Sequence, residues 1–279
     1  MCWAISGVMF KSQSKELDSL SINAIASSVA GIFFVGISLS SCWRADQLFH
    51  LKGLTILSLA GSVFISIVVG DTLYLKSLSW IGVSRALPLA SIYPLFTAVL
   101  ALFFLQEELS WTLAGGIILT MSGVYLVSVS QGGENPASFH TRERLAPTLA
   151  LMAALCWATG TTVLKYGLKE ADIFVANSVR MPLAALLLLA AARRWGHLRR
   201  ARLKPVLIVL LAGLVGSCVG GVLFLFALQN AATARATTLV STYPLAALPL
   251  AALFLKEKVV FRVVWGTLLA IGGIWLVMA

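Results

Sequence analysis

The sequence reads RALPLASIYPLFTAVLALFFLQEE over residues 85–108, and 150 residues later it reads RATTLVSTYPLAALPLAALFLKEK over residues 235–258. Around these stretches, residues 70–107 align with residues 220–257 without a gap, and 16 of the 38 positions are identical. Earlier in the chain a shift of 154 residues aligns Cys-Trp-Ala at residues 2–4 with Cys-Trp-Ala at residues 156–158. This agreement indicates an internal duplication of one unit.

The composition places both copies in a membrane. Of the 279 residues, 59% are hydrophobic and only 11% are charged, whereas a soluble domain carries about 25% charged residues. The apolar residues come in blocks of roughly 20, the length of helix that crosses about 30 Å of hydrocarbon. The net charge of +10 does not indicate nucleic-acid binding, because six of the 21 Lys and Arg residues lie in the short stretch 193–204 between two apolar blocks. Such a basic loop is typical of membrane orientation.

Ten apolar segments and one linker follow from this pattern. Gly-Gly and Asn-Pro mark the longest polar stretch, residues 131–144, as the linker between two units at residues 1–130 and 145–279. We predict an all-α membrane protein of ten transmembrane helices, at about 1–10, 20–42, 53–79, 83–105, 109–130, 146–166, 173–192, 205–229, 233–255 and 260–279.

The number of helices in each unit predicts the geometry. Because five is odd, the second unit enters the membrane upside down relative to the first, which gives an inverted 5+5 repeat. Many secondary transporters use this arrangement around a site near the bilayer midplane. The duplication therefore favours transport over a channel or an enzyme.

The first segment is shorter than its counterpart, because only two residues precede Trp3 whereas twelve residues of the sixth helix precede Trp157. A helix of roughly 15 Å does not span a bilayer. We therefore expect a truncated first helix. A signal peptide would carry a basic leader and a small-residue cleavage site, which the sequence does not show.

Two short motifs, each present twice, carry a family resemblance. The sequence has FLQEE at 104–108 and FLKEK at 254–258, and it ends the following segment with GVYLV at 123–127 and GIWLV at 273–277. This pattern resembles the EamA-type repeat, two copies of which form the ten-helix permeases of the drug/metabolite transporter superfamily. The resemblance implies an inner-membrane permease that moves amino acids, nucleotide precursors, vitamins or drug-like compounds, mostly outward.

One departure from the family pattern concerns arginine. The family usually places an arginine in the second helix of each repeat, and Arg180 fits that position. Its counterpart by the 154-residue shift is Ala26. A symmetric site with two arginines is therefore not expected.

Two charged residues fall inside predicted spans, where a charge is costly unless it is paired or hydrated. Asp71 lies about eight residues, or roughly 12 Å, from the end of the third helix. It could bind a coupling proton or a substrate amino group, or it could pair with Arg180, Lys76 or a backbone group. Arg180 could bind an anionic group of the substrate or form a structural ion pair.

Aromatic residues and prolines recur at matching positions. Tyr93-Pro94 and Tyr243-Pro244 fall in the middle of predicted helices, where proline frees a carbonyl group and kinks the helix; Pro88 adds a further break. We expect these prolines to act as hinges, and we expect both tyrosines to line a cavity. Trp3 and Trp157 complete the predicted substrate-binding set, which is Asp71, Arg180, Tyr93, Tyr243, Trp3 and Trp157.

Other polar residues have ordinary explanations. Lys11 and Lys165 lie near helix ends, where the side chain is expected to extend to the lipid headgroups, and Glu107 is expected at the interface for the same reason. Small residues spaced by four predict close helix packing in the third and eighth helices: Ser62, Ser66 and Gly70, and again Ala212, Gly216 and Gly220.

The sequence contains no catalytic or metal-binding pattern: the three histidines fall in loops, and the four cysteines lack pairing or metal spacing. We predict a secondary transporter, not an enzyme, that exports a small organic metabolite such as an amino acid or an aromatic compound by alternating access, without a cofactor. The expected partners are the substrate, membrane lipid and, where export occurs by proton exchange, protons, in a monomer or homodimer. A flippase for lipid-linked or amphiphilic molecules is the alternative on the same fold, and a scaffold without transport would have no cavity.

Overall fold

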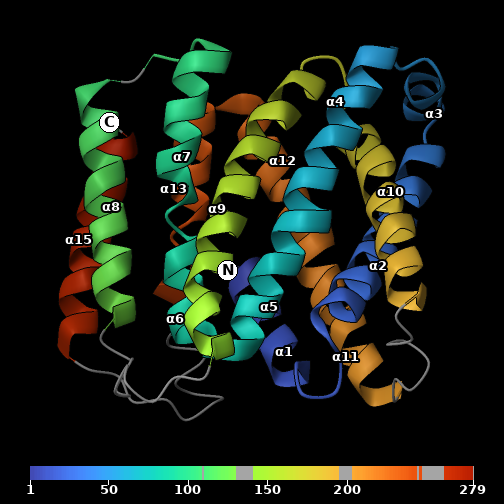
Figure 1. The fold of residues 1–279 in the computed structure, drawn as a ribbon. Coiled ribbons are helices and arrows are strands. Elements are labelled where there is room, and N and C mark those ends of the chain that lie inside the picture. Colours follow the sequence, from blue (N-terminus) through green and yellow to red (C-terminus); the bar gives the residue numbers. More distant parts are fainter. Residues whose placement is uncertain (109, 130–140, 195–202, 244, 247–260, 279) are drawn as a thin grey trace.

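A computed structural model describes residues 1–108, 110–129, 141–194, 203–243, 245–246 and 261–278 (Figure 1). Within these ranges the chain forms helices and no strand. Residues before the gap at 130–140 form α1 (Cys2–Gln13), α2 (Ser19–Leu39), α3 (Cys42–Phe49), α4 (Gly53–Val63), α5 (Thr72–Ile81), α6 (Val83–Ala90), α7 (Tyr93–Leu100) and α8 (Trp111–Val129). Residues after it form α9 (Thr141–Gly167), α10 (Ile173–Arg194), α11 (Leu203–Gly213), α12 (Gly221–Asn230), α13 (Thr233–Val240) and α15 (Phe261–Met278).

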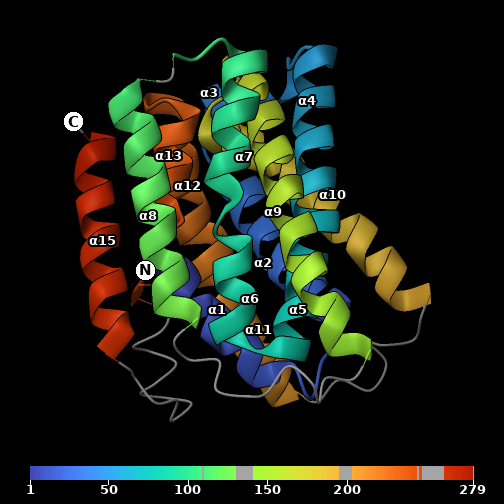
Figure 2. The same cartoon turned by 60° about the vertical axis from the view of Figure 1, so that its left-hand side comes forward.

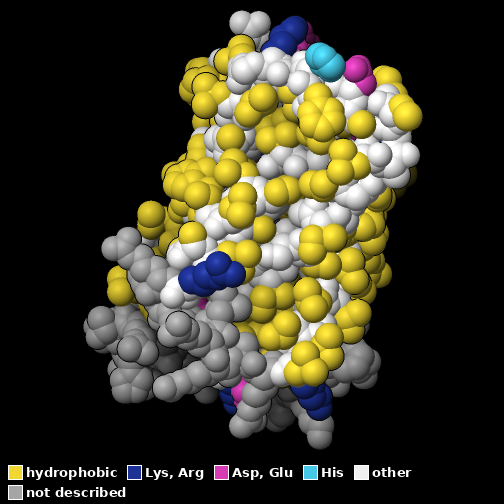
Figure 3. Space-filling view, turned by 90° about the vertical axis from the view of Figure 1, so that its right-hand side faces the viewer, with side chains coloured by type: hydrophobic (Ala, Val, Ile, Leu, Met, Phe, Trp, Pro, Cys, Tyr) yellow, Lys and Arg dark blue, Asp and Glu magenta, His cyan; other side chains and the backbone are white. Residues whose placement is uncertain are grey.

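The described part of the chain contains five helices that are long and apolar enough to cross a membrane: Ser19–Leu39, Gly53–Ile81, Leu145–Gly167, Ile173–Arg193 and Leu203–Asn230. Shorter apolar helices lie at Tyr93–Leu105, Trp111–Leu126 and Leu268–Val277. Figure 3 shows hydrophobic side chains over much of one face, with charged side chains at its two ends and a Lys or Arg side chain between them, beside the grey residues. This distribution is that of an all-α membrane fold, as predicted.

Corresponding helices of the two halves run in opposite directions. In Figures 1 and 2, α2 lies beside its counterpart α10 and runs antiparallel to it. The helices α8 and α15 form a second antiparallel pair of the same kind. The two halves thus form the inverted repeat that an odd number of helices per unit requires.

Two long helices change their hydrogen bonding at the same place in each repeat. Residues Phe64–Asp71 form a π-helical segment between α4 and α5, and residues Leu214–Gly220 form another between α11 and α12. Wide turns of this kind are frequent at functional sites because they redirect side chains. Asp71 is the last residue of the first segment, and its counterpart Gly221 directly follows the second.

The helix that carries Tyr93 and Pro94 is broken rather than kinked. It ends as α6 at Ala90, and α7 begins at Tyr93 after a turn. Pro94 is the second residue of α7, where a proline lacks only an amide hydrogen that would have no helical partner. Pro88 lies inside α6, but its side chain, like the whole of Pro244, lies outside the residues described.

The small-residue stripes allow close helix contacts, as the sequence predicted. A methyl group at Gly160 of α9 would lie 2.6 Å from the Ser66 Cβ and 2.9 Å from the Ser62 carbonyl oxygen. In the other half, a methyl group at Gly216 would lie 2.8 Å from the Ser6 Cβ of α1. Each stripe therefore packs against the first helix of the opposite repeat.

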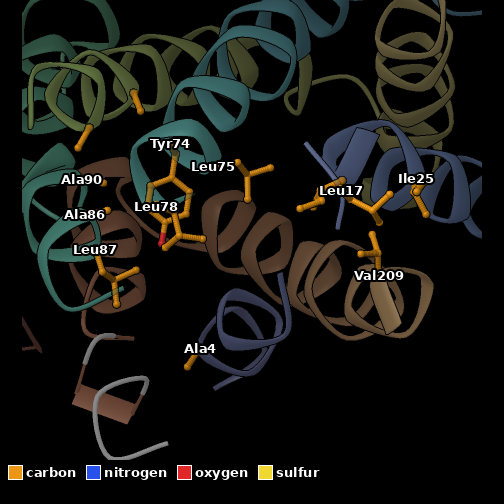
Figure 4. Packing of buried hydrophobic residues seen from close by; sticks show 13 residues of the cluster. Ala4, Leu17, Ile25, Tyr74, Leu75, Leu78, Ala86, Leu87, Ala90 and Val209 are labelled. Carbon is orange, nitrogen blue, oxygen red and sulfur yellow. The ribbon is translucent and has the colours of Figure 1, made fainter. Parts of the chain in front are cut away.

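The hydrophobic core also joins the two halves. Figure 4 shows Tyr74, Leu75 and Leu78 of α5 in one cluster with Leu17, which precedes α2, and with Val209 of α11. Because α5 and α11 belong to different repeats, the two halves bury part of their apolar surface against each other.

Lys11 and Lys165 each bind backbone carbonyl groups at the end of another helix. The Lys11 ammonium donates hydrogen bonds to the carbonyl oxygens of Leu78 and Ser79, at 3.0 and 3.2 Å, where α5 approaches its end. Lys165 donates to the carbonyl oxygens of Leu228 and Ala231 at the end of α12. The last carbonyl groups of a helix have no helical partners and carry partial negative charge, so both lysines cap helix ends.

Glu107, from the FLQEE motif, caps the start of a helix in the opposite half. Its carboxylate accepts hydrogen bonds from the Thr233 amide at 2.9 and 2.8 Å and from the Thr233 hydroxyl at 2.6 Å. Thr233 is the first residue of α13, where free amide groups and the helix dipole favour an anion. Glu257, its counterpart, lies outside the residues described.

Helix α3 is the one described helix that the apolar pattern missed. It lies in a connection at one end of the bundle (Figure 1) and none of its residues is buried. Polar contacts hold this end together: Arg44 pairs with Asp172 at 3.3 Å, and Lys52 pairs with Glu170 at 2.7 Å. A search for spans about 20 residues long does not detect an eight-residue helix at the interface.

Candidate functional site

A cavity of about 200 Å³ lies between the two halves. Its walls come from α1, α2, α5, α7, α9, α10, α12, the two π-helical segments and the residue Tyr243, which follows α13. All six residues that the sequence predicted for substrate binding line this one cavity: Asp71, Arg180, Tyr93, Tyr243, Trp3 and Trp157.

One wall is an aromatic cluster around Trp157. Its ring lies 5.1 Å from the ring of Tyr74 in a tilted arrangement and 5.8 Å from the ring of Tyr93 in an edge-to-face arrangement. Trp157 belongs to the second repeat and both tyrosines belong to the first. This tryptophan therefore inserts into the opposite half.

A second cluster around Trp3 repeats the first. The Trp3 ring lies 5.3 Å from Phe224 in a tilted arrangement and 6.4 Å from Tyr243 in an edge-to-face arrangement. Trp3 is the counterpart of Trp157 by the shift of 154, and Phe224 and Tyr243 are the counterparts of Tyr74 and Tyr93 by the shift of 150. The duplicated sequence thus produces two aromatic walls related by the pseudo-twofold symmetry.

Matching glycines make room for the two tryptophans. A methyl group at Gly70 would lie 3.1 Å from the Trp157 Cδ1, and one at Gly220 would lie 2.9 Å from the Trp3 Nε1. Glycine at both positions therefore lets each indole ring rest directly on the backbone of the opposite half.

The polar contacts of the tryptophans break the symmetry. The Trp157 indole donates a hydrogen bond of 2.7 Å to the Asp71 carboxylate. At the position equivalent to Asp71 the second repeat has Gly221, and the Trp3 indole instead donates to the Gly216 carbonyl oxygen at 2.9 Å. Among the described residues that line the cavity, Asp71 is therefore the one carboxylate, and it lies on the side of the first repeat.

Arg180 is held by hydrogen bonds rather than by an ion pair. Its Nε donates to the Ser62 hydroxyl at 3.1 Å, and its Nη1 donates to the Asn177 Oδ1 at 3.0 Å. The ion pairs formed by the described residues do not include one between Arg180 and Asp71. The partner of Asp71 is Trp157, which was not among the partners considered from the sequence.

Sequence reasoning missed several residues of this cavity. Tyr74 and Phe224 complete the aromatic clusters, and the buried Asn177 contacts Arg180. A usable signal existed for Asn177, because the repeat keeps asparagine at residues 23 and 177 inside apolar segments. A polar side chain inside a membrane helix needs hydrogen-bond partners, which come either from neighbouring helices or from a ligand.

The cavity has the composition of a small-molecule site. Aromatic and aliphatic side chains form most of its surface, and a few polar groups converge on it. Its volume is below the roughly 300–1,000 Å³ of pockets for drug-sized ligands. Among the described residues, no group of three or more His, Cys, Asp or Glu side chains is arranged to hold a metal ion.

Comparisons with known proteins agree with this architecture. An uncharacterized transporter of Archaeoglobus fulgidus is 28% identical over 282 residues, which cover 100% of this chain and 94% of that protein. An uncharacterized transporter of Clostridium kluyveri is 24% identical over 96% of this chain and 86% of its own length. A solved crystal structure matches 98% of this chain and 94% of its own, with a TM-score of 0.77 at 12% identity, which shows the fold alone.

The family comparison covers nearly the whole chain. The model of the EamA-like transporter family matches residues 1–129 and again residues 144–279. The repeated motifs, the inverted helices and the transporters among the relatives all agree with this match. The chain therefore belongs to the EamA-like transporter family and is a multi-pass integral membrane protein.

Proposed function

We propose that this protein is a secondary transporter that exports a small organic metabolite through the cavity between its halves by alternating access. The observation that carries the proposal is the pair of matching aromatic walls, Trp157 with Tyr74 and Trp3 with Phe224, each made of side chains from both repeats. A rocking motion of the halves would change both walls together and open the cavity to one side at a time. The two halves are the proposed units 1–130 and 145–279, with 131–144 as linker.

The proposed site consists of Asp71, Arg180, Tyr93, Tyr243, Trp3 and Trp157. The tryptophans and tyrosines would hold the apolar part of the substrate, and Asp71 would carry the coupling proton. Asp71 lies in a π-helical segment and is held by a tryptophan of the opposite half, so a change in its protonation would act on the contact between the halves. Pro94, at the start of α7, is the proposed hinge on this side.

Flux into proteoliposomes tests the function. We expect uptake of small aromatic or amino-acid probes that a pH gradient accelerates in the wild type and no longer accelerates in Asp71→Asn. The control is Asp46→Asn, which changes an exposed carboxylate of α3 and is expected to keep the gradient effect.

Each alternative gives a different result. Flux that does not respond to the gradient in either protein would make this a facilitator without proton coupling. Movement of long-chain amphiphiles without movement of small probes would indicate a flippase. Absence of flux for every probe in the wild type would contradict transport through the cavity.

A further inference from the structure

The second repeat leaves one buried amide group without a hydrogen-bond partner. Asn177 is 0% exposed, it lines the cavity, and its Nδ2 has no partner. Its orientation is fixed because Arg180 donates to its Oδ1 at 3.0 Å, and a guanidinium group only donates. The free group is therefore a donor.

The first repeat satisfies the equivalent amide internally. The Asn23 Nδ2 donates to the Ile67 carbonyl oxygen at 2.8 Å and to the Thr72 hydroxyl at 3.1 Å. The counterpart of Thr72 is Val222, which has no hydroxyl group. A buried polar group without a hydrogen-bond partner destabilises the fold. A ligand that supplies an acceptor to the Asn177 Nδ2 would remove this destabilisation.

The space beside this amide is also specific to the second repeat. Gly221 stands where the first repeat has Asp71, and it lines the same cavity. A methyl group at Gly221 would lie 3.8 Å from the Asn177 Nδ2 and 3.8 Å from the Phe34 ring, which is ordinary contact. A small group can therefore reach the amide without displacing backbone.

We infer that the substrate places an anionic acceptor group, a carboxylate, at Gly221, where it accepts a hydrogen bond from the Asn177 Nδ2. The positive charge of Arg180, bonded to the same amide, favours an anion over a neutral carbonyl group. The aromatic walls hold the apolar body of the molecule. This inference rests on the proposed function and narrows its substrate to small carboxylates with an aromatic or apolar body.

Binding of three probes with one body tests the inference: radiolabelled 3-phenylpropionate, 3-phenylpropanamide and 3-phenylpropylamine, each with purified protein in lipid nanodiscs. We expect the carboxylate to bind about tenfold or more tightly than the neutral amide, because a charge-assisted hydrogen bond is lost. We expect the amine to bind least.

Three variants locate the effect. Gly221→Asp places a carboxylate next to Asn177, and it is expected to abolish binding of the carboxylate probe and to increase binding of the amine. Gly221→Ala adds bulk without charge and is expected to keep the rank order of the probes. Asn177→Leu removes the donor and is expected to reduce the preference for the carboxylate over the amide, leaving the part that the charge of Arg180 contributes. This variant keeps the test valid if Gly221→Asp does not fold.

The outcomes separate the inference from the proposed function. If the wild type binds the amine or the amide most tightly, or if Asn177→Leu keeps the carboxylate preference undiminished, the acceptor subsite is wrong while the cavity remains a binding site. If the wild type binds none of the three probes, the cavity itself is contradicted as a site for small aromatic molecules, and the proposed function falls with it.

Discussion

Replacing each tryptophan of the pseudo-symmetric pair with phenylalanine tests the asymmetry of the cavity. Both substitutions keep an aromatic ring and remove one indole N–H group. In Trp157→Phe the lost hydrogen bond is the 2.7 Å contact to the Asp71 carboxylate, and in Trp3→Phe it is the 2.9 Å contact to the Gly216 carbonyl oxygen. The two variants differ chiefly in the charge of the acceptor.

The expected magnitudes follow from that difference. Hydrogen bonds to charged groups contribute about 1.5–3 kcal/mol, whereas neutral ones contribute about 0.5–1.5 kcal/mol. Trp157→Phe should therefore lower the free energy of unfolding by about twice as much as Trp3→Phe. Reversible unfolding by a denaturing detergent in mixed micelles measures both values.

A double-mutant cycle isolates the contact. In an Asp71→Asn background the acceptor is neutral, so Trp157→Phe should cost about as much as Trp3→Phe does in the wild type. Equal losses for the two tryptophans in the wild type, or no coupling between Trp157 and Asp71, would refute the reasoning that the indole holds the carboxylate.

Three further substitutions test contacts outside the cavity. Glu107→Ala removes the cap at the start of α13 and should lower the free energy of unfolding by about 1 kcal/mol. Its control, Glu108→Ala, changes an exposed neighbour and should alter the free energy of unfolding by less than about 0.5 kcal/mol. Equal effects of the two variants in denaturant titrations would contradict the cap. Gly123→Ala directs a methyl group to within 2.5 Å of a backbone carbonyl oxygen of α15 and should lower the free energy of unfolding by about 1–3 kcal/mol. In the control Gly115→Ala the methyl group meets nothing within 4 Å, and the same titration should show no loss of stability. Hydrogen bonds from a lysine and a threonine hold the pKa of Glu170 below its usual 4.5. The contribution of the ionised Glu170 to stability is therefore present above that pH and is lost as the pH falls through the lowered pKa. The melting temperatures of wild type and Glu170→Gln should differ at neutral pH and converge in acid, and a difference that does not change with pH would contradict this.

The helices and their inverted arrangement could be predicted because a helix that crosses lipid must consist almost entirely of apolar residues. Blocks of about 20 apolar residues give the spans, and the repeat of a five-span unit gives the direction of the second copy. The same repeat identified Trp3, Trp157, Tyr93 and Tyr243 by their recurrence. A residue that recurs occupies the same position in both repeats. Where that position lies near the pseudo-twofold axis, the two copies of the residue lie close together in the structure.

The polar partners could not be predicted in the same way. Hydrogen bonding depends on distances of about 3 Å between atoms far apart in the chain, and no periodicity records them. Asp71 was identified as an intramembrane charge, but its bond to Trp157 joins positions 86 residues apart. Lys11 and Lys165 were placed near helix ends correctly, yet the carbonyl groups that they bind belong to other helices, at the end of α5 and at the end of α12.

The breaks at functional positions were only partly visible in the sequence. Proline near Tyr93 predicted an irregular helix, and the structure places a turn before it. The π-helical segment that ends at Asp71 has no proline and no sequence signature. Nothing in the residue types of this stretch therefore distinguishes it from an ordinary apolar helix.

The central claim is that the cavity opens to each side of the membrane in turn. Ser217 lines it, and a cysteine placed there can be labelled by a membrane-impermeant maleimide once Cys2, Cys42, Cys156 and Cys218 have been replaced. In vesicles of known orientation, we predict labelling of Ser217→Cys from both sides, with protection by a transported substrate on each side. Labelling from one side only, under every condition, would contradict alternating access.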